Sequence, residues 1–137
     1  MYGVMSLIEE PLLSIAILLA RICLAAVFLV SGIHKAIWFS KSLEEFRHAR
    51  VPLVHFSVTA TIVLHLLASL GLLTGILVME SAIALAAFTL LATIRVHDFW
   101  NRGGRERLIS SRNALANLAV IGGLILLAAT GPGELTL

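Results

Sequence analysis

The sequence predicts an all-α membrane protein, a four-transmembrane-helix bundle built from two helical hairpins with both termini on the non-cytoplasmic side. Of the 137 residues, 59% are hydrophobic and 13% are charged, whereas an average soluble domain is about half apolar and a quarter charged. A folded domain of this size still exposes roughly a third of the surface of its unfolded chain, and this chain has too little polar surface to cover it. Its long apolar stretches therefore predict helices that cross lipid.

The first span is expected over residues 11–36. At about 1.5 Å per residue this stretch can cross a hydrocarbon core of about 30 Å, and Pro11 suits a helix start because its missing N–H would have no partner there. Residues 1–10 contain two acids and no base. They lack the basic region of a cleavable signal peptide, so we expect them to remain on the mature protein.

The cytoplasmic loop over residues 37–52 is polar and carries both signs of charge. Leu43, Phe46 and Ala49 recur in it at roughly helical spacing, which predicts a short amphipathic helix on the membrane surface.

The remaining three spans are expected over residues 53–79, 81–97 and 113–130, with a second basic loop over residues 98–112. Glu80 alone separates the second span from the third, which predicts a tight hairpin. The fourth span ends at Gly131, Pro132 and Gly133, which stop a helix efficiently. The chain is thus expected to form one membrane domain over residues 1–137.

The basic residues predict the topology. Nine of the ten Lys and Arg residues lie in or beside the two loops, and the acids on the opposite side have no basic partner. The nine are Lys35, Lys41, Arg47, Arg50, Arg95, Arg102, Arg105, Arg107 and Arg112, and the acids are Glu9, Glu10, Glu80 and Glu134. The positive-inside rule puts both loops in the cytoplasm and both termini outside, in a membrane of the bacterial inner-membrane type.

Small residues predict how the spans pack, because lipid supplies no hydrophobic drive between helices and small side chains let backbones approach closely. Gly71 and Gly75 form a GxxxG pattern, Ala82 and Ala86 repeat its spacing, and Gly122 and Gly123 lie inside span four. We expect these residues to tighten the bundle.

The single cysteine, Cys23, excludes an intrachain disulfide framework and a CxxC redox site. The chain shows no HExxH, no HxH and no cysteine set, so no metal site is expected. The segregated charge gives no reason to expect nucleic acid. Without a visible nucleophile, thiol pair or metal motif, we expect a non-catalytic subunit rather than a complete enzyme.

Polar residues inside lipid are the candidates for function, because each is costly unless it finds a partner. Arg21, about 15 Å below the outer surface by helical rise, is either a clamp for an anion or carbonyl, or a structural arginine bonded to carbonyls or to Glu9 and Glu10. His65, near the midplane, either relays protons or binds haem, metal or a quinone carbonyl, or it is a neutral histidine bonded to Ser69, Thr61 or a neighbouring helix.

A second group is expected near the cytoplasmic face, within roughly 10 Å of one depth. It consists of His34, Lys35, His55, His97, Asn113 and Asn117. These side chains either line a pocket for a polar head group or serve only interfacial solvation and interhelical hydrogen bonding. Arg102, Arg105 and Arg107 are expected to meet anionic lipid head groups.

Several segments together resemble the DoxX family of small four-span membrane proteins, in the right order over nearly the whole chain. They are RICLAAVFLVSGIHK at residues 21–35, the Pro52 opening, GLLTG at residues 71–75, HDFW at residues 97–100 and NLAVIGG at residues 117–123. The resemblance implicates Arg21, Ser31, Gly32, Lys35, His97 and Asn117 as signature positions. It also shows two departures: the family usually carries Glu where this chain has His65, and often a basic residue where it has Ala116.

The resemblance implies redox work at the membrane, since members of that family include the membrane subunit of thiosulfate:quinone oxidoreductase, a component of thiol and superoxide defence, and a helper in methylamine dehydrogenase maturation. We therefore expect an integral subunit of a quinone-linked assembly, in contact with lipids and other subunits. Candidates for binding the quinone are Arg21, Lys35, His65, His97 and Asn117; haem is not expected. A purely structural accessory subunit, a small solute carrier and a homo-oligomer stay open.

Overall fold

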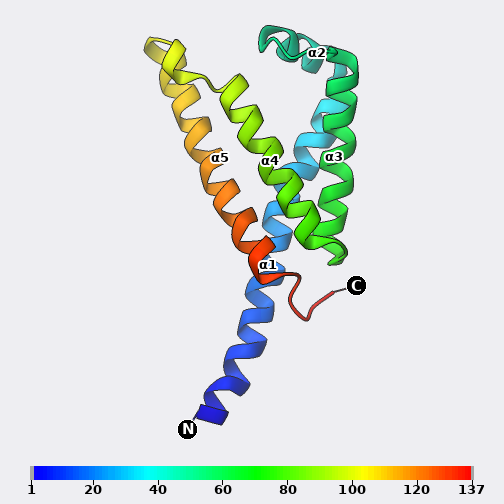
Figure 1. The fold of residues 1–137 in the computed structure, drawn as a ribbon, viewed down its shortest axis with the longest axis vertical. Coiled ribbons are helices and arrows are strands. Elements are labelled where there is room, and N and C mark those ends of the chain that lie inside the picture. The colour runs from blue at the N-terminus through cyan, green and yellow to red at the C-terminus, as the bar shows by residue number, and fades with distance from the viewer. Residues whose placement is uncertain (1, 137) are drawn as a thin grey trace.

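The structure, a computed structural model, describes residues 2–136 (Figure 1). In chain order the helices are α1 (Tyr2–Ile37), α2 (Phe39–His48), α3 (Val54–Thr74), α4 (Val78–Val96), the short 3-10 helix η1 (Phe99–Asn101) and α5 (Gly104–Thr130). Helices α1, α3, α4 and α5 are long and apolar enough to cross a membrane. No strand occurs in residues 2–136, and the predicted all-α class with four spans is confirmed.

The four long helices pack as two pairs. Helix α1 lies along α3, and α4 lies along α5, while α3 and α4 contact each other less extensively. Both termini and the turn at residues 75–77 lie at one end of the molecule, here called the terminal end (Figure 1). The opposite end, here called the basic end, holds α2 and residues 97–103. The two pairs meet toward the terminal end and stand apart at the basic end (Figure 1).

Helix boundaries differ from the expected spans in three places. Helix α1 continues through residues 2–10, so Pro11 lies inside it instead of at its start. The break between α3 and α4 falls at residues 75–77, ahead of Glu80, because Gly75 (φ 83°) and Leu77 (φ 50°) adopt left-handed backbone conformations that end one helix and precede the next. Helix α5 starts at Gly104, ahead of residue 113.

The predicted amphipathic helix is present as α2. Its Leu43 is 8% exposed and Ser42 is 3% exposed, and the helix packs on the basic end of α3. The hydroxyl of Ser42 donates to the backbone oxygen of Trp38 (3.1 Å), which closes the short connection from α1. Helix α2 therefore anchors the basic end of the α1–α3 pair.

The buried core is small, as expected for a bundle whose outer surface faces lipid. Its members come from all four long helices and are Ala25, Phe28, Ala68, Leu72, Val78, Ala82, Leu85, Leu124 and Leu127. Three glycines mark where helices approach closely. A Cβ on Gly32 would lie 3.0 Å from the Cβ of His65, one on Gly71 would lie 2.5 Å from Ser81 Oγ, and one on Gly123 would lie 3.4 Å from Leu24 Cδ2.

The packing role expected for the small residues is thus seen at Gly71 and Gly123 and at the fully buried Ala82. It is not seen at Gly122, where a Cβ would meet no described atom within 4 Å. Gly122 is exposed, so within the described chain only one member of the glycine pair faces a neighbouring helix.

Replacing Gly32 by Val is expected to force α1 and α3 apart and to lower the free energy of unfolding by about 1–3 kcal/mol, the usual cost of overpacking. Titration with a denaturing detergent, followed by circular dichroism, measures the loss. Gly122→Val is the matched control, because it adds the same side chain to a helix position that faces open space, and it should leave the unfolding curve unchanged. Equal effects of the two substitutions would contradict the close approach of α1 and α3.

Candidate functional site

Arg21 is fully buried at 0% exposure, and its guanidinium bonds to backbone oxygens from two other parts of the chain. Nε donates to Leu72 (2.7 Å) and Nη2 to Leu73 (2.9 Å), both in the last turn of α3. Nη1 donates to Pro132 (3.1 Å) and to Leu135, in the segment after α5. Arg21 therefore ties α1 to the end of α3 and to the C-terminal segment, as the structural interpretation expects, with carbonyls and not Glu9 or Glu10 as its partners.

The depth expected for Arg21 is corrected by these contacts. Helix α3 has 21 residues, about 31 Å of helix, which just crosses a hydrocarbon core. The carbonyls in its last turn therefore lie at the membrane boundary and not about 15 Å inside it. The depth of about 15 Å was counted from Pro11 as the outer boundary of the membrane, whereas α1 begins at Tyr2 and extends beyond the other helices (Figure 1). Long side chains on a helix also point toward its N-terminus, which carries the guanidinium of Arg21 outward.

His65 lies in the interior with both ring nitrogens unsatisfied. The residue is 2% exposed, and neither Nδ1 nor Nε2 has a hydrogen-bond partner within residues 2–136. One turn further along α3, Ser69 is 0% exposed, and its Oγ likewise has no partner among the described atoms. The expected alternative, in which His65 bonds to Ser69 or Thr61, is not formed: the hydroxyl of Thr61 donates to the backbone oxygen of Ser57 (2.8 Å).

Two aromatic rings flank the imidazole of His65. The ring centroid of Phe88, on α4, is 4.8 Å away with an interplanar angle of 89°, and that of Phe28, on α1, is 5.3 Å away at 70°. Both are edge-to-face arrangements, which aromatic pairs prefer. No sequence pattern marks these phenylalanines, because an aromatic residue in an apolar span does not indicate which residue it packs against.

Lys35 belongs to the same helix pair as His65. Its Nζ donates to Ser31 Oγ (2.6 Å), one turn back on α1. Lys35 follows Gly32 by three residues and so lies on the face of α1 that approaches His65. Lys35 and His65 therefore lie at the α1–α3 interface, which Arg21 joins nearer the terminal end.

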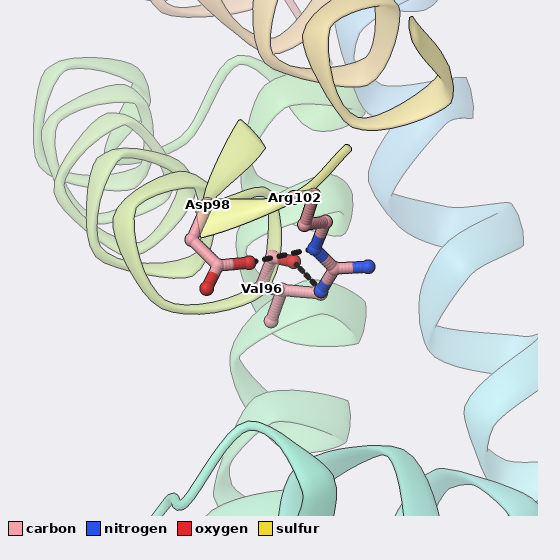
Figure 2. A network of polar contacts seen from close by, with 3 residues as sticks. All are labelled: Val96, Asp98 and Arg102. Carbon is pink, nitrogen blue, oxygen red and sulfur yellow. Dashed lines mark hydrogen bonds and ion pairs between the residues drawn. The ribbon is translucent and has the colours of Figure 1, made fainter. Parts of the chain in front are cut away.

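His97 and Asn117 belong to the other pair. Asn117 Nδ2 donates to Thr93 Oγ1 (2.9 Å), which joins α5 to α4 and is the interhelical bond expected as the alternative to a pocket. His97 follows the last residue of α4, and next to it Arg102 donates from Nε to Asp98 Oδ1 (2.8 Å) and from Nη2 to the backbone oxygen of Val96 (3.0 Å), as Figure 2 shows.

The expected cytoplasmic cluster is thus distributed over two helix pairs. His34 lies near Trp38, and His55 near Phe39, with ring centroids 6.5 Å and 6.4 Å apart, both beside α2. Within residues 2–136, no hydrogen bond or ring contact joins these histidines to His97 or Asn117. Across residues 2–136 no three His, Cys, Asp or Glu side chains gather closely enough to hold a metal ion.

Comparison with known proteins identifies relatives. The family model described as DoxX matches residues 16–98. The chain is 30% identical over 124 residues to the inner membrane protein YqjF of Escherichia coli (strain K12), covering 90% of each chain. It is 24% identical over 123 residues to the inner membrane protein YphA of the same organism, covering 90% of this chain and 88% of that protein. No solved structure matches the chain.

Replacing Arg21 by Ala is expected to lower the free energy of unfolding by about 3 kcal/mol or more, because four backbone carbonyls lose their charged donor at once. Arg21→Lys should recover part of the loss, since an ammonium still donates but cannot reach both segments in the same fork. Arg105→Ala, which removes an exposed arginine from the first turn of α5, should change stability by less than about 0.5 kcal/mol. Detergent-induced unfolding measures all three variants, and an unaffected Arg21→Ala protein would contradict the structural role.

Proposed function

Because the chain belongs to the DoxX family of integral membrane proteins, we propose that it is the membrane subunit of a quinone-linked redox assembly and that His65 and Ser69 bind the quinone. The observation that carries the proposal is the pair of buried polar side chains on α3 whose hydrogen-bonding atoms have no partner within residues 2–136. Arg21, Lys35 and Asn117, in contrast, are bonded to other groups of the protein.

Unsatisfied buried polar atoms are expensive. A buried donor or acceptor without a partner costs about 1–3 kcal/mol, and in lipid no bulk water reaches it. His65 and Ser69 lie four residues apart on one face of α3. A ligand that offers polar atoms to both side chains would recover this free energy on binding. The pair therefore favours ligand binding and does not stabilise the unliganded fold.

The surroundings favour a ligand with an apolar ring and carbonyl oxygens. Phe28 and Phe88 supply aromatic walls beside the imidazole, and neutral histidine and serine each have a donor for a carbonyl oxygen. A quinone combines a flat apolar ring with two such oxygens and dissolves in the membrane. Phe88 is only partly buried and stands on the other helix pair, so its ring forms the wall that a quinone would displace on entry.

Lys35 has a supporting role in the proposal. Its ammonium lies on the α1 face that approaches His65 and is held by Ser31 Oγ. A positive charge near a quinone stabilises the anionic, reduced form. Arg21, His97 and Asn117 are not needed for this role, since Arg21 and Asn117 are bonded elsewhere and His97 lies at the basic end.

We place both basic loops in the cytoplasm and both termini outside, with α1–α3 and α4–α5 as the two hairpin-like halves. Charge supports this orientation, because six of the eight arginines lie within residues 37–52 and 98–112. The two E. coli relatives are named as inner membrane proteins, which supports the same membrane for this chain.

A second candidate is a purely structural accessory subunit. The observation that favours it is Arg21, whose bonds go to backbone carbonyls and to no acidic group of the described chain. Under this alternative the polar residues only fix the bundle, and the redox chemistry belongs wholly to its partners.

His65→Leu separates the two candidates. It is expected to abolish binding of decylubiquinone by the purified protein, measured by calorimetry in detergent, while the free energy of unfolding stays the same or rises, because an unsatisfied polar group is replaced by an apolar one. His55→Leu, which changes an exposed histidine on the same helix, should leave quinone binding intact. Unchanged quinone binding in His65→Leu would contradict the proposed site and favour the accessory subunit.

The orientation predicts which connecting segments a reagent outside the cell can reach. In a Cys23→Ser background, a membrane-impermeant maleimide added to intact cells should label Glu134→Cys, in the segment after α5, and should not label Asn101→Cys, in η1. Both cysteines should react once the membrane is opened. Labelling of Asn101→Cys in intact cells would reverse the topology.

A further inference from the structure

A groove of about 710 Å³ lies at the basic end, between α2 and the end of α4 with η1. Its walls carry several charged side chains, Glu45 and Arg50 from the α2 side and Arg95, Asp98 and Arg102 from the α4 side. Ile94, Val96 and Trp100 add an apolar wall. The groove is separate from the interior face of α3 that holds His65, and it is not needed for quinone binding.

Some of these charged side chains already have partners within the protein. Arg102 is held by Asp98 and by the carbonyl of Val96 at the end of α4 (Figure 2). Glu45, Arg50 and Arg95, in contrast, form no ion pair with any residue in the described part of the chain. The groove therefore presents two arginines and one carboxylate without ionic partners.

The groove also lies between the carboxyl ends of two helices. Helix α2 ends at His48 and α4 ends at Val96, and the C-terminus of a helix carries about half a negative charge. The carbonyls of Glu45, Phe46 and Arg47 already accept backbone bonds, but each carbonyl oxygen has a second lone pair that can accept from an ammonium group. The groove thus offers a place for a cation as well as for an anion.

From this pairing of charges we infer that the groove binds the head group of a phospholipid that has both a phosphate and a primary ammonium group, as phosphatidylethanolamine does. Arg50 and Arg95 hold the phosphate oxygens, because guanidinium matches phosphate geometry. Glu45 and the carbonyls at the end of α2 accept from the ammonium. The apolar wall of Ile94, Val96 and Trp100 lies beside the start of the acyl chains.

The position of the groove suits a lipid better than a soluble ligand. Arg95 is in the last turn of a membrane-spanning helix, and tryptophan prefers the depth of the head groups. A lipid bound there would stand between the two helix pairs where they separate.

Trp100 reports on occupancy. The chain has two tryptophans, so Trp38→Phe leaves Trp100 as the sole tryptophan beside the groove. Quenching of its fluorescence by phospholipids with brominated acyl chains is measured in mixed micelles for phosphatidylethanolamine, phosphatidylglycerol and phosphatidylcholine. Phosphatidylethanolamine should bind several-fold more tightly than the other two, since one lacks the ammonium and the other has a quaternary ammonium without N–H donors.

Two variants test which charged side chains bind the phosphate and which bind the ammonium group. The double variant Arg50→Gln/Arg95→Gln should weaken binding of phosphatidylethanolamine about 30-fold, because each arginine near the surface contributes attraction to phosphate. Glu45→Gln should reduce its affinity to that of phosphatidylcholine. The matched control, Arg105→Gln/Arg107→Gln, removes two arginines that do not line the groove and should keep the affinity of the parent protein.

Three results would overturn the inference. Equal loss in the control would mean that general surface charge attracts the lipid. Tighter binding of phosphatidylglycerol than of phosphatidylethanolamine would exclude a role for the ammonium. Soluble phosphoethanolamine has no acyl chains. If it displaced the brominated phosphatidylethanolamine completely, at concentrations that leave the micelles intact, the ligand would be a soluble anion and not a lipid.

Discussion

The contact between Arg21 and four backbone oxygens holds the rest of the bundle in place. A guanidinium inside or at the edge of lipid is costly unless its donors are satisfied, and the last carbonyls of a helix have no partner within that helix. Arg21 satisfies both demands, because two of its acceptors are Leu72 and Leu73 at the end of α3. The other two acceptors, the backbone oxygens of Pro132 and Leu135, hold the segment after α5 against the end of α3. Three distant parts of the chain are joined by one side chain.

This contact also sets how α1 and α3 align. With Arg21 fixed at the end of α3, the antiparallel course of the two helices brings Gly32 opposite His65, where the missing side chain allows close approach. At the terminal end the guanidinium of Arg21 is therefore bonded, whereas in the interior next to Gly32 the polar atoms of His65 and Ser69 have no partner within residues 2–136. The stabilising contact and the proposed ligand site thus lie at different levels of the same helix pair.

The apolar runs predicted much of the fold. Four long stretches gave four spans, because a chain this apolar has no other way to cover its surface, and the spacing of Leu43 and Phe46 predicted α2 correctly. The break at residues 75–77 was displaced, since Gly75 ends α3 through its backbone conformation, whereas the sequence offered Glu80 as a more visible polar boundary.

The site was harder to predict, for physical reasons that concern particular residues. The acceptors of Arg21 are backbone carbonyls, which every residue has, so no sequence signal marks Leu72 or Pro132. Its depth depended on where α1 begins relative to α3, which only the packing determines. Lys35 and His97 appeared to share one depth, yet they belong to helix pairs that separate at that level. The polar nature of His65 was visible in the sequence, but its lack of a partner was not.

The separation of the two pairs at the basic end has a mechanical consequence. A membrane-spanning bundle whose helix pairs stand further apart at one end than at the other (Figure 1) displaces unequal numbers of lipids from the two leaflets. The lateral pressure of the bilayer then differs between the two ends of the protein. Bending the bilayer therefore changes the work needed to move the two helix pairs apart or together. Such a shape couples the spacing of its helices to membrane curvature.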